Sequence, residues 1–183
     1  MRNACLAVVA MTLAASCSVQ KPPIKEIYAE DMPVSFAYGS LAGRTPEYQQ
    51  ITNPRTGAVV QRMMVDGGGE WAIIDFNAVS GDYAYRTQDP RTIVQSMFKP
   101  GVAVEWGDQG NLHGTRAVNW RRVALTDPAA SCLALVRSVR EHVEGRIGSG
   151  VQAFAAGIYC RAGEGSIPAE EIPRIASALQ VRA

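Results

Sequence analysis

CLALVRSV at residues 132–139 and AFAAGIYC at residues 153–160 are the two stretches that decide the fold. Each is a short apolar run of the length typical of a buried strand. The first begins with its cysteine and the second ends with its cysteine. Two neighbouring antiparallel strands would therefore bring Cys132 and Cys160 together at one end, linked through the polar, glycine-rich run at residues 140–150.

Cys132 and Cys160 are the two cysteines of the folded part, because Cys5 and Cys17 belong to the N-terminal segment described below. A pair of cysteines in an oxidising compartment predicts one structural disulfide. Free thiols and a redox pair remain alternatives, although a redox pair usually has Cys-x-x-Cys spacing. No zinc or other metal site is expected, since two cysteines without close-spaced partners do not supply four ligands.

The rest of the chain also alternates apolar segments with Gly, Pro and Asp, as strand-rich domains do. Five further strands are predicted at residues 34–38, 59–65, 71–76, 102–106 and 117–125.

Two segments have helical spacing. Asp89 and Pro90 are favourable first residues of a helix, and the apolar residues that follow are Ile93, Val94, Met97 and Phe98. A C-terminal helix is predicted from a stripe formed by Ile172, Ile175, Ala176 and Leu179. Strands without regular strand–helix alternation favour an α+β fold, with a mainly antiparallel sheet, about two helices and one disulfide.

The first 16 residues have the features of a bacterial signal peptide. Arg2 supplies the positive charge, residues 4–15 are almost entirely apolar, and small residues precede Cys17. The apolar stretch is shorter than the roughly 20 residues that a membrane-spanning helix needs. We therefore expect a segment that is removed after export.

The run Leu13-Ala14-Ala15-Ser16-Cys17 resembles the lipobox of bacterial lipoproteins. The resemblance implies cleavage before Cys17, acylation of Cys17 as a membrane anchor, and a location on the periplasmic side of the envelope. Ser18 after the cysteine favours the outer membrane over the inner one. The run departs from the common pattern in having alanine three places before the cysteine, so a soluble periplasmic protein and an uncleaved anchor remain alternatives.

Residues 17–32 are expected to be the lipidated cysteine and a polar tether, and residues 33–183 a single globular domain. A chain of 183 residues with 47% hydrophobic and 19% charged residues can bury a core. Its formal net charge of +1 does not suggest a nucleic-acid partner.

Catalytic signals are weak. The run Asp66-Gly67-Gly68-Gly69-Glu70 lacks the Lys and Ser/Thr of a phosphate loop, and its two carboxylates are too few for calcium, so a hairpin turn is predicted. The Gly-x-Ser-x-Gly motif of many hydrolases is absent. His113, in an expected polar turn at residues 109–114, is the favoured candidate for a general base, and His142 is the alternative. No cofactor is predicted.

Seven arginines stand against three acids between residues 115 and 161. The first candidates for a basic binding surface are Arg116, Arg121, Arg122, Arg137 and Arg140, and the same face could include Arg146 and Arg161. Arginine is favoured at interfaces, although strand alternation would send some of these side chains to opposite faces.

We therefore expect a non-enzymatic interaction or assembly module, anchored to the membrane by lipid and paired with an envelope protein partner. One alternative is a small periplasmic hydrolase that uses His113. Another is a ligand-binding protein that uses the aromatic residues Tyr83, Tyr85, Trp106 and Trp120.

Overall fold

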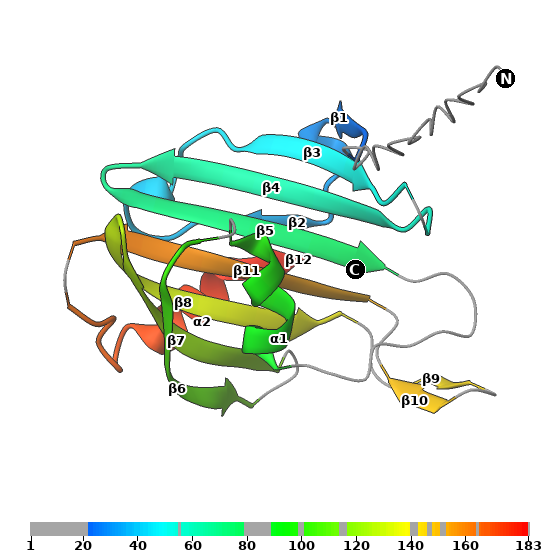
Figure 1. The fold of residues 1–183 in the computed structure, drawn as a ribbon. Coiled ribbons are helices and arrows are strands. Elements are labelled where there is room, and N and C mark those ends of the chain that lie inside the picture. Colours follow the sequence, from blue (N-terminus) through cyan, green and yellow to red (C-terminus); the bar gives the residue numbers. More distant parts are fainter. Residues whose placement is uncertain are drawn as a thin grey trace, which may run out of the picture.

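A large antiparallel β-sheet dominates the computed structural model (Figure 1). The structure describes residues 22–54, 56–78, 89–98, 101–113, 117–139, 143–145, 148–150, 153–163 and 165–182. In spatial order the strands of the sheet are β1 (Ile24–Glu26), β3 (Glu47–Thr52), β4 (Val59–Gly67), β5 (Glu70–Ala78), β11 (Ala153–Ala162), β8 (Ala129–Ser138), β7 (Val118–Thr126) and β6 (Val104–Leu112).

The remaining elements are short. Two small antiparallel ladders pair β2 (Val34–Phe36) with β12 (Leu179–Val181) and β9 (Val143–Gly145) with β10 (Gly148–Gly150). The α-helices are α1 (Pro90–Val94) and α2 (Ile172–Ala178). The 3-10 helices are η1 (Ala29–Asp31), η2 (Gly39–Leu41) and η3 (Gln95–Met97).

The two apolar runs form neighbouring antiparallel strands, as predicted, and they lie in the interior of the sheet. β8 and β11 are neighbours, and nearly all of their residues are buried because both faces of the sheet are covered there. Cys132 lies directly opposite Cys160, with their Cα atoms 4.0 Å apart, and the predicted disulfide is confirmed.

Each face of the sheet has its own apolar cluster. On one face Met63, Ile74 and Leu133 pack against residues of β2, α2 and β12. On the other face Val94 of α1 packs against the disulfide and its neighbours. Figure 1 shows α1 in front of the sheet, with β2, β12 and α2 behind it.

The expected α+β class is wrong, because the described chain is mainly β. Helices form at both predicted places, but α1 has five residues and α2 has seven. Neither is long enough to form a helical layer across eight strands. Part of the layer behind the sheet is itself a strand pair, β2 with β12.

In the large sheet, two polar segments form strands that the sequence did not suggest. Glu47–Thr52 forms β3. The sequence predicts a turn at residues 109–114, but residues 109–112 form the second half of β6. β6 is an edge strand with one face partly in solvent, so its polar residues are tolerated. Within the expected tether, Ile24–Glu26 pairs with β3 and Met32 is fully buried.

Candidate functional site

Glu70 is the centre of the main polar cluster in the described structure. Its carboxylate oxygen Oε1 accepts a hydrogen bond from the Tyr159 hydroxyl at 2.6 Å and one from Arg161 Nε at 3.2 Å. Its other oxygen, Oε2, accepts from the backbone N–H of Ser40 at 2.6 Å. The Ser40 hydroxyl lies 2.9 Å from the same oxygen and also contacts the Gly67 carbonyl.

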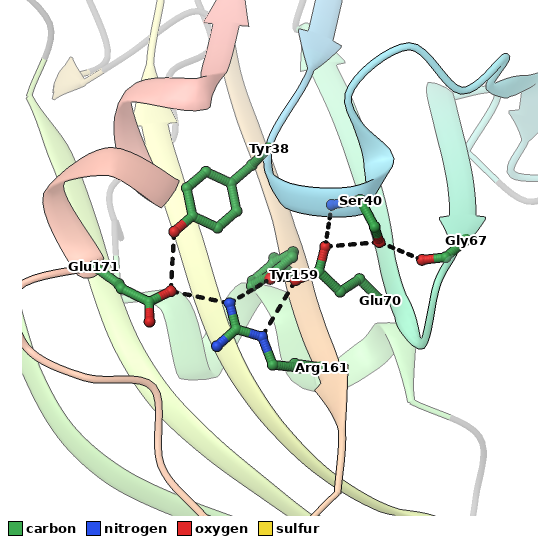
Figure 2. Close-up of polar contacts among 7 residues, drawn as sticks. All are labelled: Tyr38, Ser40, Gly67, Glu70, Tyr159, Arg161 and Glu171. Atoms are coloured by element: carbon green, nitrogen blue, oxygen red, sulfur yellow. Dashed lines mark hydrogen bonds and ion pairs between the residues drawn. The ribbon is translucent and has the colours of Figure 1, made fainter.

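Arg161 links this carboxylate to a second one. Its Nη2 donates to Glu171 Oε2 at 2.9 Å and lies 3.3 Å from the Tyr159 hydroxyl oxygen. Glu171 also accepts a hydrogen bond from the Tyr38 hydroxyl at 2.9 Å. Figure 2 shows Arg161 between the two glutamates. The Glu70 network, as we call it, consists of Tyr38, Ser40, Glu70, Tyr159, Arg161 and Glu171.

The fold brings these residues together from four elements. Glu70 begins β5 directly after a turn whose central residues Gly68 and Gly69 both have positive φ, which favours a two-residue hairpin. Tyr159 and Arg161 lie on one face of β11, two residues apart. Gly39 lets η2 approach closely, because a Cβ atom there would collide with the Glu70 carboxylate.

The network keeps its acids charged. Burial alone would raise the pKa of the Glu70 carboxyl, but the hydrogen bonds that it accepts outweigh burial and lower this pKa below its ordinary value. The pKa of Glu171 is lowered chiefly by the hydrogen bond from Arg161. Burial, followed by the hydrogen bond to Glu70, raises the pKa of the Tyr159 phenol.

These contacts make the network a poor acid–base catalyst. Three donors bind the Glu70 carboxylate, namely the Ser40 N–H, the Tyr159 hydroxyl and the Arg161 Nε–H, and its lowered pKa makes it a weak base. The raised pKa of Tyr159 keeps its phenol protonated near neutral pH. The arrangement instead ties β11 to η2 and to the start of α2.

Sequence reasoning missed this network, although it contained one usable signal. β11 is apolar throughout its buried length except for the hydroxyl of Tyr159 and the charge of Arg161 at its end. A polar group on a buried strand face needs a partner. Glu70, considered from the sequence only as half of a cation site, is that partner.

The predicted arginine surface is dispersed in the described structure. Arg121 points toward the side of α1, where its Nη1 lies 3.9 Å from Asp89 Oδ1. Arg122, the next residue, belongs to the opposite face and pairs with Asp108 at 2.8 Å. Arg137 is buried and donates to the carbonyl of Leu179. Arg116, Arg140 and Arg146 lie outside the described residues.

The other predicted residues are not gathered into one site. His113 follows β6 and is exposed. Trp106 packs edge-to-face on Phe98 and lies beneath Arg91, while Trp120 packs against the larger apolar cluster. Tyr83, Tyr85, His142 and Cys17 lie outside the described residues. In the described ranges, no three His, Cys, Asp or Glu side chains are close enough to hold a metal ion.

A second polar site is an open groove of about 560 Å³ between the start of α1 and strands β6 and β7. Its lining includes Asp89, Gln109, Asn111 and Asn119. A groove of this size is within the usual range for small-ligand sites, about 300–1,000 Å³. Unlike the Glu70 network, it offers polar groups beside a space that a ligand can enter.

Comparisons with protein families, curated proteins and solved structures return no match. Within the described part of the chain, every helix is too short or too polar to span a bilayer.

Proposed function

We propose that this chain is a lipoprotein on the periplasmic side of the bacterial envelope, whose domain works by binding another envelope component and not by catalysis. The observation that carries the second half of the proposal is the closed Glu70 network. Its central carboxylate is bound by donors from within the protein and is held charged, with a pKa below its ordinary value.

Two features support the cellular address. The run Leu13-Ala14-Ala15-Ser16-Cys17 has the composition of a lipobox, and acyl chains on Cys17 would hold the protein on a membrane. The disulfide between Cys132 and Cys160 favours an exported protein, since disulfides persist in oxidising compartments and are rare in the cytosol. Ser18 favours the outer membrane.

The anchor is tested with tagged Cys17→Ser in a Gram-negative host that is fed labelled palmitate. We expect the unsubstituted protein to carry label and to sediment with outer membranes, whereas Cys17→Ser loses the label and leaves the membrane fraction. Cys5→Ser is the matched control, because it removes a cysteine of the same signal that the proposal leaves unmodified. A labelled Cys17→Ser protein would refute lipidation at Cys17.

Binding is tested in the same strains by mild crosslinking and mass spectrometry of the purified protein. We expect a defined envelope component that is recovered with Cys5→Ser and reduced with Cys17→Ser, since the anchor holds the domain beside its partner. A protein recovered without any crosslinked component from both strains would refute the binding role.

A further inference from the structure

The groove beside α1 owes its polar lining to a β-bulge. β6 and β7 pair in regular register up to Trp106, which lies opposite Val123 on the α1 side of the sheet. The register then shifts, and Gln109 lies opposite Arg121. The extra residue turns Gln109 and Asn111 toward α1, where unbroken alternation would have placed Asp108 and Gly110. Bulges often re-aim side chains in this way near functional sites.

The amides of the groove are held in place before any ligand arrives. Asn111 lies opposite Asn119 on the neighbouring strand, and its Nδ2 donates a hydrogen bond to Asn119 Oδ1. This bond fixes the orientation of the Asn111 amide, whose carbonyl oxygen remains an acceptor. Gln109 is exposed beside it and supplies both a donor and an acceptor. Side chains ordered in advance lose less entropy on binding.

Asp89 is the charged residue among the described residues that line the groove, and an arginine beside the groove compensates its charge. Asp89 caps α1 by accepting the backbone N–H of Arg91 at 2.9 Å, and the guanidinium of Arg121 is 3.9 Å from the same carboxylate. Among the described residues of the lining, the polar side chains are thus this compensated carboxylate and the amides of Gln109, Asn111 and Asn119, a set with little preference for a charged ligand. It suits a neutral ligand that both donates and accepts hydrogen bonds.

From this arrangement we propose that the groove binds a neutral oligosaccharide. Sugar hydroxyl and acetamido groups donate and accept at adjacent positions, which matches the alternating donors and acceptors of amide side chains. The choice of ligand class rests on the proposed envelope location, where glycans are abundant. The bound sugar would lie across β6 and β7, with Gln109 and Asn111 as its principal hydrogen-bonding residues.

The probes are tri-N-acetylglucosamine and maltotriose, and binding is measured by isothermal titration calorimetry. We expect saturable binding of at least one of these sugars to the detergent-purified protein. Losing one or two hydrogen bonds in Asn111→Ala or Gln109→Ala should raise the half-saturating concentration about tenfold. Gln50→Ala, on β3 near the opposite edge of the sheet, is the matched control and should bind as the unsubstituted protein does.

Because Gln109 is exposed, its substitution should leave the thermal midpoint unchanged, which separates loss of binding from loss of fold. The inference fails if neither sugar gives saturable binding, if all three variants bind equally well, or if a neutral tripeptide such as tri-alanine binds while both sugars do not. None of these failures alters the result of the Cys17→Ser experiment, so the anchor and the ligand class are judged separately.

Discussion

Glu70 is a carboxylate that the fold buries and still keeps charged. Its exposed fraction is 9%, yet its pKa is lowered because donors from two other elements, η2 and β11, hydrogen-bond to it. A carboxylate buried without such donors would instead take up a proton. The charge of Glu70 is therefore a product of the assembled fold and not of its own sequence neighbourhood.

Replacing Glu70 by Gln should destabilise the protein by about 2 kcal/mol at pH 7, since hydrogen bonds to a charged group are lost. It should also flatten the acid dependence of stability. Because the pKa of Glu70 is lower in the folded protein than its ordinary value of 4.5, the unfolded chain takes up protons first as the pH falls. The stabilisation is thus present above about pH 4.5 and is lost as the pH falls through the lowered pKa.

Urea denaturation at pH 7 and pH 3 measures both effects. Glu26→Gln, at an exposed position of β1, is the matched control. Glu171 should leave some acid dependence in Glu70→Gln, because its pKa is also lowered. The fall in unfolding free energy from pH 7 to pH 3 should be smaller in Glu70→Gln than in Glu26→Gln. An equal fall in the two variants would contradict a lowered pKa for Glu70.

The partners of Glu70 could not be predicted from sequence. Ser40, Tyr159 and Arg161 are separated from it by 30, 89 and 91 positions. Only the strand order, which puts β11 beside β5, brings them together. The arginine surface shows the same limit, because adjacent residues such as Arg121 and Arg122 project from opposite faces of one strand.

At the scale of elements, apolar runs were predictable and polar strands were not. The central strands β8 and β11, their disulfide, and the short α1 with its Asp89 cap follow from patterns within a few residues. β3 and the second half of β6 are polar strands at or near the sheet edges, where solvent on one face removes the need for apolar residues. Missing them led to the α+β prediction.

The pairing of β8 with β11 should depend on its disulfide. Cys132 and Cys160 are 28 positions apart, and closing a loop of that size stabilises a fold by about 3.5 kcal/mol in the chain-entropy model. The variant with both Cys132→Ala and Cys160→Ala should lose roughly that amount in urea denaturation. A reductant should lower the stability of the unsubstituted protein and leave the double variant unchanged. Equal stability of the two oxidised proteins would contradict this role.

At the scale of the whole molecule, the fold begins before residue 33. Met32 is fully buried, and Ile24–Glu26 adds a strand beside β3. A chain starting at residue 33 should therefore be at least about 2 kcal/mol less stable than one starting at residue 22, since burying one methionine side chain contributes about 1.5–3 kcal/mol. A chain starting at residue 18 is the control, and it should be as stable as the chain that starts at residue 22. Equal unfolding midpoints in all three would show that residues 22–32 contribute nothing.

The position of β11 has a consequence for how the protein comes into being. β3, β4 and β5 pair in sequence order, as do β6, β7 and β8, but the two groups join only through β11, the last long strand of the described chain. During synthesis, β5 and β8 would each present an unpaired edge until residues 153–162 arrive. A chain that ends before β11 would therefore have two unpaired strand edges that favour aggregation, and it would not fold as a smaller version of the same domain.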